Sequence, residues 1–427
     1  MTLFVSLICI IFSAFLPQNP LSQAPVDTSD QQLGVQEALN IALENSPALN
    51  RIKEQLNAQK GKRRASWMID DPEVYYMREG MKNSQFTEQR WAISQSMDFP
   101  LASYYQLQSS DKQVKALETR LEAEKLQLKA EVKRAYTDLA YSIEIFHLSN
   151  EQVNLAQKLK DAASTRFEVG ESSQIDVVQS EVQLAEAQND LNDAQRRIQN
   201  ARYTLFNVIG LDPDQQRYEL EFPDTLAYFE YNIQQEQVLS KLPDHPEARF
   251  MNKQVDAARY QIKATKTRYL PSLRIDYYKQ ELPSFSSNYD FTGFEVGFTI
   301  PLWFAINQSG EVQTAKAHYH DMQWAYKETS LRLKKQAEQA WHSYQSSRST
   351  IQRYHDNIRT KSRNLLDLTQ EGYSVGEMDL LTLLEAQRTY LDSQRRYYQA
   401  LRDYYHQMIE LERYLQINIV FNQPVQP

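Results

Sequence analysis

The sequence has only one cysteine, Cys9, and it lies in the N-terminal apolar run 4–16. This run has the length of the hydrophobic region of a signal peptide and is too short to span a membrane. A small-residue cleavage site follows, so we predict a signal peptide over 1–24, although no Lys or Arg precedes the run. Its removal would leave a mature chain, 25–427, without cysteine, which excludes disulfides and thiol chemistry.

Proline and glycine are scarce as well, with 15 and 10 among 427 residues. Proline is absent from 101–212 and from 302–423, and few glycines interrupt these segments. Because proline and interior glycine are the strongest helix breakers, each segment is predicted to form two long helices that meet at one glycine, Gly170 or Gly376. A helix over about 102–165 would be roughly 95 Å long, too long for one globular core.

Both glycines lie in a repeated motif, since residues 166–171 read RFEVGE and residues 372–377 read GYSVGE. An N-cap residue follows each motif, Ser173 in the first copy and Asp379 in the second, and Asp176 completes a capping box with Ser173. The helices beyond have a seven-residue apolar spacing and a second stripe of small residues, which is typical of coiled-coil seams. The sequence therefore predicts two similar helical hairpins.

Between the helical segments, large apolar residues alternate with small or polar ones, which is typical of β-strands. The predicted strands are 74–77, 91–99, 272–280 and 292–300. On the last strand one face is apolar and is predicted to face lipid; it consists of Phe294, Val296, Phe298 and Ile300. A small soluble sheet with one wet face is the alternative for any single strand. Four such strands in an exported chain favour a membrane β-barrel, and since four cannot close a barrel, several copies must share one.

Prolines stand at equivalent points in the two halves of the chain. They are Pro47, Pro72 and Pro100 in the first half and Pro246, Pro271 and Pro301 in the second. Each half is thus predicted to contain a helix, two strands, a long helix, a glycine turn and a second long helix. We predict repeat one over 33–212, a connector over 213–241 and repeat two over 242–417.

Charge and motifs exclude several functions. The net charge of −8 is spread along the chain without a basic block, which argues against nucleic acid as a partner. No phosphate loop, zinc spacing or nucleophile motif occurs, so no catalytic residue, cofactor or metal site is predicted, and no enzyme activity is expected. His318 and His320 point to different faces of a helix and are interpreted as surface histidines. The stripe of Tyr390, Tyr397 and Tyr404 is interpreted as seam packing.

The order and duplication of these features resemble the outer-membrane efflux protein family, the TolC-like channels of Gram-negative bacteria. The resemblance covers about 33–417 and is carried by the two Val-Gly turns, the Pro-Leu pairs that begin at Pro100 and Pro301, and the NARYTLFNVIG segment at 200–210. It implies a homotrimer in which each chain gives four strands to a shared β-barrel in the outer membrane. The long helices would form an α-barrel in the periplasm.

The resemblance also implies the partners and the function. The trimer would be the passive exit duct of a tripartite efflux pump and would export drugs or metal cations without catalysis or cofactor. It would dock to a periplasmic membrane-fusion adaptor and to an inner-membrane pump of the resistance-nodulation-division type, with outer-membrane lipid around the barrel. In the family the glycine turns form the periplasmic tip, where the adaptor docks.

The family closes this tip with packed helices and acidic residues, which assigns roles to particular positions. The periplasmic gate would consist of Asp176, Thr382 and Glu385, although Thr382 departs from the family pattern because it is not acidic. Three copies of Glu385 would form an acidic ring that favours cations. The alternative is that Glu385 is an ordinary solvated residue.

The adaptor contacts would come from the two turns themselves. They are Val169, Gly170, Glu171, Val375, Gly376 and Glu377. Plain turn geometry is the alternative explanation for both glycines. A periplasmic coiled-coil scaffold without a pore is the alternative to the channel as a whole. The apolar strand face argues against the scaffold, because a soluble protein gains nothing by exposing such a stripe.

Overall fold

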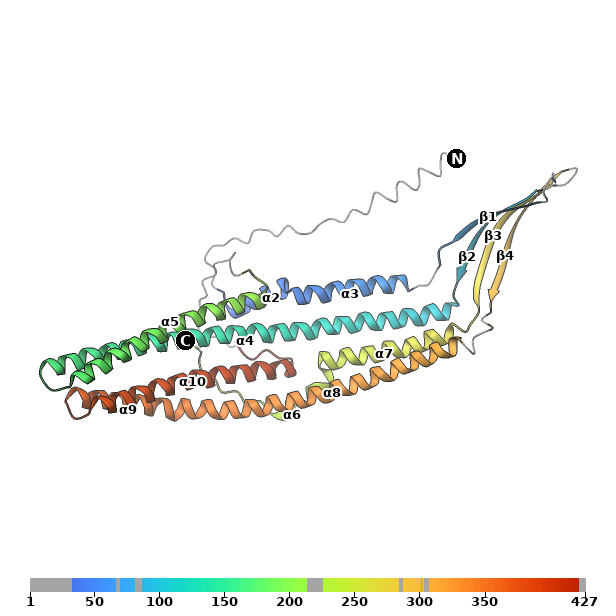
Figure 1. Cartoon of the computed structure of the whole chain (residues 1–427). Coiled ribbons are helices and arrows are strands. Elements are labelled where there is room, and N and C mark those ends of the chain that lie inside the picture. Colours follow the sequence, from blue (N-terminus) through green and yellow to red (C-terminus); the bar gives the residue numbers. More distant parts are fainter. Residues whose placement is uncertain are drawn as a thin grey trace.

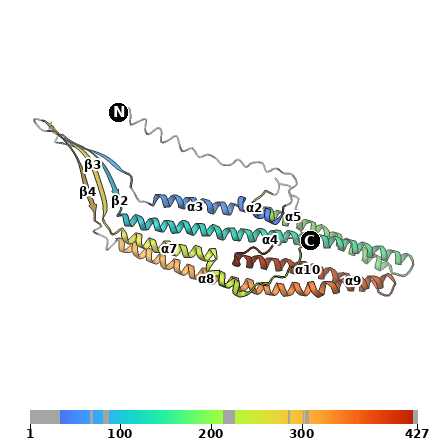
Figure 2. The same ribbon diagram turned by 180° about the vertical axis from the view of Figure 1, so that it is seen from behind.

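The computed structural model describes residues 33–66, 70–80, 87–212, 226–283, 287–300, 302 and 307–421. The predicted signal peptide, 1–24, therefore lies outside the described residues. The molecule is elongated: long helices run side by side, a four-stranded sheet projects from one end, and both helical hairpins turn at the other end (Figures 1 and 2). The predicted fold class, mainly helical with a small sheet and two similar halves, is confirmed.

The first half contains the predicted order of elements. They are α2 (Val35–Asn45), α3 (Pro47–Ala65), β1 (Glu73–Gly80), β2 (Thr87–Met97), α4 (Pro100–Glu168) and α5 (Gln174–Ile209). Pro47 is the first residue of α3, and the Ser46 side chain caps that helix by accepting the N–H of Leu49 at 3.4 Å. Helix α4 has 69 residues and is about 100 Å long. The scarcity of helix breakers therefore predicted its length correctly.

The second half repeats the order with additional short elements. They are α6 (Gln235–Lys241), η1 (Leu242–Asp244), α7 (Pro246–Thr267), β3 (Ser272–Pro283), β4 (Asn288–Thr299), α8 (Asn307–Arg353), η2 (Tyr354–Ile358), α9 (Arg359–Ser374) and α10 (Leu380–Leu415). The prediction of one uninterrupted helix before Gly376 was wrong, because η2 is a π-helical turn between α8 and α9. Neither glycine nor proline marks this turn; the His355 ring packs there against Tyr228 and Tyr397.

The four strands form one antiparallel sheet in the order β1-β2-β3-β4. Strands β2 and β4 begin earlier than predicted, at Thr87 and Asn288 instead of residues 91 and 292. In β2 the added residues 87–90 are polar and give no alternation, whereas in β4 the added aromatics Tyr289 and Phe291 alternate in the opposite phase to Phe294 and Val296. The register aligns Ile93 with Tyr277 and Tyr277 with Phe294, so large apolar residues share one face.

The largest buried cluster lies in the middle of the helical body, where α8 and α10 pack against residues 226–233 of the connector. Tyrosine hydroxyls hold this irregular segment. Tyr404 donates to the carbonyl of Phe229 at 3.0 Å, and Tyr405 donates to that of Ala227 at 2.8 Å. Tyr390, Tyr397 and Tyr404 are all buried, as expected for seam packing.

A buried ion pair fixes the segment after α10 against α4. Lys133 Nζ lies 2.7 Å from Glu412 Oε2, and their side chains are only 3% and 7% exposed. Lys133 also donates to the carbonyl of Val420 at 2.9 Å, and Glu412 accepts the backbone N–H groups of Ile419 and Val420. Burial lowers the pKa of Lys133, and the Glu412 charge opposes that shift. The pair therefore holds three segments together: α4, α10 and the chain that follows.

Candidate functional site

The two glycine turns lie at the end of the molecule opposite the sheet and have the same backbone geometry (Figure 1). Gly170 has a φ of 79°, and its counterpart in the second turn has 83°. In the first turn the N–H of Glu171 donates to the carbonyl of Arg166 at 2.8 Å; in the second, Glu377 donates to Gly372 at 2.8 Å. Both turns are Schellman motifs, in which glycine takes the left-handed conformation at no steric cost.

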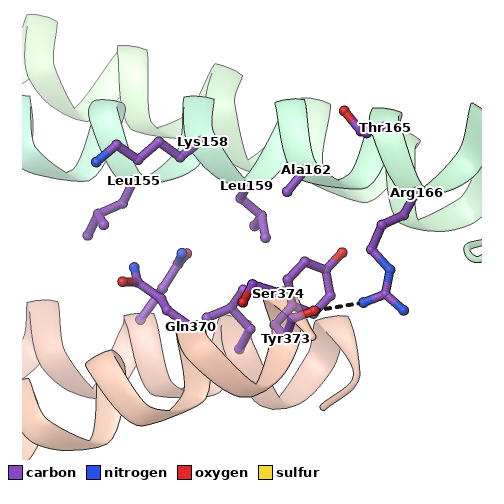
Figure 3. Close-up of a pocket in the computed structure, with 11 residues that line it drawn as sticks. Leu155, Lys158, Leu159, Ala162, Thr165, Arg166, Gln370, Tyr373 and Ser374 are labelled. Atoms are coloured by element: carbon purple, nitrogen blue, oxygen red, sulfur yellow. Dashed lines mark hydrogen bonds between the residues drawn. The ribbon is translucent and has the colours of Figure 1, made fainter. Parts of the chain in front are cut away.

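Arg166 joins the two turns. Its Nη1 donates to the carbonyl oxygen of Tyr373 at 3.0 Å, and its guanidinium lies 4.8 Å from the centroid of the Tyr373 ring (Figure 3). Burial raises the pKa of the Tyr373 hydroxyl, an effect that the Arg166 charge opposes. In the second repeat Gly372 stands at the position of Arg166, and a Cβ there would lie 2.7 Å from Cγ of Met378. The hydrogen bond and the cation–π contact therefore run only from the first turn to the second, since the second turn has no arginine at the equivalent position.

A cavity of about 420 Å³ lies beside this link, between α4 and the α9–α10 hairpin (Figure 3). Its apolar wall comes from Leu155, Leu159 and Ala162 of α4 and Leu383 of α10. The remaining lining residues are Lys158, Thr165, Arg166, Gln370, Tyr373, Ser374 and Gln387.

A second link holds the hairpins together further from the turns. Arg363 Nη1 lies 3.1 Å from Glu151 Oε1 of α4 and donates to the Tyr390 hydroxyl at 2.9 Å. The Tyr390 hydroxyl itself donates to Glu151 Oε1 at 3.0 Å. These three side chains come from α9, α4 and α10, so the network ties both helices of the second hairpin to the first.

The structure gives two of the three predicted gate residues a local role. Asp176 accepts the N–H of Ser173 at 3.2 Å in the predicted capping box of α5. Thr382 donates its N–H to Asp379, the N-cap of α10, at 2.9 Å. Hydrogen bonds from the Thr382 side chain and then its backbone hold the pKa of Asp379 below its usual value. Glu385 lies one turn further along α10 and is exposed.

The predicted adaptor residues are all exposed at the turns. Val169 and Val375 occupy equivalent positions and are each 66% exposed. A second equivalent pair, Ile175 and Leu381, is also exposed, so each turn presents two aliphatic side chains to solvent. Sequence reasoning did not single out this second pair, although the alignment of the two repeats contains it.

Three of the predicted lipid-facing residues, Phe294, Val296 and Phe298, share one face of β4, and Ile300 directly follows the last residue of that strand. Phe294, Val296, Phe298 and Ile300 are all exposed. The register extends this face across the other strands through Val74, Tyr76, Trp91, Ile93, Leu273, Ile275 and Tyr277. Among the described helices, none combines the length and the apolarity that crossing a membrane requires.

Two comparisons relate the sequence to known proteins. The family model described as "Outer membrane efflux protein" matches residues 38–211 and 242–415. The outer membrane efflux protein BepC of Brucella suis biovar 1 (strain 1330) is 23% identical over 257 residues, which cover 59% of this chain and 55% of BepC. The chain thus aligns with about half the length of that relative.

Solved structures share the fold. The outer membrane protein VceC of Vibrio cholerae has a TM-score of 0.75 at 16% identity, covering 89% of this chain and 95% of VceC. CusC, whose structures are described in terms of folding and transmembrane channel formation, has a TM-score of 0.75 at 15% identity, covering 94% of this chain and 99% of CusC. At these identities the likeness is one of fold.

Proposed function

The chain belongs to the outer membrane efflux protein family, and on that premise we propose that three copies form a passive exit channel of a tripartite efflux pump. The observation that carries the proposal is the sheet, which has four strands, one apolar face and two outer edges without a partner strand among the described residues. Four strands cannot close a barrel, and an open edge cannot lie in lipid. Sharing one barrel among several copies satisfies both constraints.

In this proposal the apolar face of Phe294, Val296, Phe298 and Ile300 contacts outer-membrane lipid. The helical body extends into the periplasm and surrounds the duct. Residues 1–24 are removed as a signal peptide, and repeat one (33–212), the connector (213–241) and repeat two (242–417) make up the mature channel. A periplasmic scaffold without a pore does not explain an exposed apolar face that extends across four strands.

We assign the partners by the same proposal. A periplasmic membrane-fusion adaptor docks at the turns, and an inner-membrane pump, of the resistance-nodulation-division type, supplies the energy and selects the drug or metal cation. The exposed pairs Val169/Val375 and Ile175/Leu381 support docking here, because aliphatic side chains exposed at equivalent positions mark an interaction surface.

A cysteine placed at Val169 or Val375 is expected to crosslink to the adaptor in whole cells. The mature chain contains no other cysteine if the signal peptide is removed, so each variant reports one position. The matched control is Glu186→Cys, an exposed position on α5 away from the turn. Equal crosslinking from all three positions, or crosslinking only from Glu186→Cys, would remove the turns as the docking site.

The gate proposal rests on Glu385, with Asp176 and Thr382 beside it. Three copies of Glu385 brought close around the channel axis would repel one another and attract cations. Replacing Glu385 by alanine is therefore expected to raise the conductance of the trimer in planar bilayers and to weaken its block by divalent cations. Arg388→Ala, another exposed change on α10, serves as the control. If Glu385→Ala left both the conductance and the block at wild-type values, the acidic ring would be abandoned.

A further inference from the structure

The face of the sheet opposite the apolar residues carries two ion pairs. Arg90 Nη2 of β2 lies 2.8 Å from Glu295 Oε2 of β4, and Arg274 Nε of β3 lies 3.1 Å from Asp276 Oδ2 of the same strand. The register places Asp276 directly beside Glu295, and β-strand alternation puts both on the face opposite Phe294. If the apolar face contacts lipid, these charges line the lumen of the barrel.

The Arg90 side chain is held in place across three strands. It leaves β2, lies over the Tyr278 ring of β3 at 4.1 Å from the centroid, and reaches Glu295 on β4. The neighbouring glycine makes room for this arrangement, because a Cβ at Gly293 would lie 2.7 Å from the Tyr278 hydroxyl oxygen. The guanidinium is therefore fixed on the polar face by an ion pair and a cation–π contact.

The carboxylates of the two ion pairs differ in exposure. Asp276 is 1% exposed, so Arg274 compensates a buried carboxylate whose removal from water would otherwise be costly. In the other pair, Arg90 is 22% exposed and Glu295 is 49% exposed. Adjacent carboxylates on a sheet repel each other, and each of these two has its own arginine. The Asp276 carboxylate is thus enclosed by the sheet while Arg274 is 54% exposed, whereas both charges of the Arg90–Glu295 pair reach solvent.

We propose that Arg90 and Glu295 set the ion selectivity of the outer-membrane end of the channel. The proposal rests on the proposed function, since it requires the polar face to line a shared barrel. In the wild type the two charges balance at one level of the lumen. Removing either one leaves three like charges there in the trimer, and fixed charges on a pore wall select the counter-ion. Small charged solutes that pass through the barrel meet the Arg90 and Glu295 side chains whether the periplasmic tip is open or closed.

The test is the reversal potential of purified trimers in planar bilayers under a KCl gradient. Glu295→Gln is expected to shift the ratio of potassium to chloride permeability towards chloride by about twofold or more at 0.1 M salt, where charges act over roughly 10 Å. Arg90→Gln is expected to shift the ratio towards potassium, and the double variant to return it close to wild type. Arg90→Lys keeps the charge and is expected to keep the wild-type ratio.

The matched control is Glu281→Gln, which removes a carboxylate from β3 that is likewise about half exposed but lies on the opposite face by strand alternation. Its permeability ratio is expected to equal that of the wild type. A conducting Glu295→Gln channel with unchanged selectivity, or an equal shift from Glu281→Gln, would overturn the inference and leave the proposed channel standing. Absence of current from the wild type would overturn the proposed channel and this inference together.

Discussion

Replacing Lys133 by methionine is expected to lower the free energy of unfolding by about 3 to 5 kcal/mol, because it leaves a buried carboxylate without its cation. Glu412 is 7% exposed and pairs with Lys133 at 2.7 Å. The same change removes a donor from the carbonyl of Val420. The loss is measurable as a lower thermal unfolding midpoint of the purified protein, followed by circular dichroism of the helices.

Two further variants separate the buried charge from the loss of packing. Adding Glu412→Gln to Lys133→Met is expected to recover part of the stability, because no unpaired charge remains and the amide oxygen still accepts the N–H groups of Ile419 and Val420. Lys129→Met changes an exposed lysine one turn earlier on α4 and is expected to be nearly neutral. Equal melting of Lys133→Met and Lys129→Met would contradict the assignment of a stabilising pair.

The double variant Arg166→Ala/Arg363→Ala is expected to open the periplasmic tip. It removes the Arg166 link to Tyr373 and the Arg363 link to Glu151 and Tyr390. Both links are partly exposed, so each is worth about 1 kcal/mol, and together they would change the open fraction by roughly 10- to 30-fold. The measurement is the mean conductance of single trimers in planar bilayers.

A single arginine variant within α10 tests whether the position of the arginines matters. Arg395 pairs with Asp392 within α10 at 3.6 Å and reaches no other helix through this pair. Arg395→Ala is therefore expected to leave the mean conductance unchanged. If the double variant conducted like Arg395→Ala, the two links would not restrain the tip, and closure would have to come from contacts between chains.

Local signals in the sequence predicted much of this architecture. Two Val-Gly turns, the proline-free segments and the cap at Ser173 act within a few residues, so the sequence reveals them without knowledge of the fold. Strand alternation likewise identified the apolar face of β4, since it depends only on a period of two. The first residues of β2 were missed because they are polar and show no alternation, and those of β4 because Tyr289 and Phe291 alternate out of phase with the rest of the strand.

Contacts between distant segments could not be predicted in this way. Lys133 and Glu412 come together only because α10 packs along α4, and neither has an unusual sequence context. Arg166 was part of the duplicated motif, yet its reach to Tyr373 depends on how the two hairpins sit side by side.

The conductance of the purified wild-type protein in planar bilayers shows whether this chain forms a channel. We expect discrete, uniform current steps that become larger in Arg166→Ala/Arg363→Ala. A protein that stays out of the membrane and carries no current, either as wild type or as the double variant, would rule out the channel and favour a periplasmic scaffold.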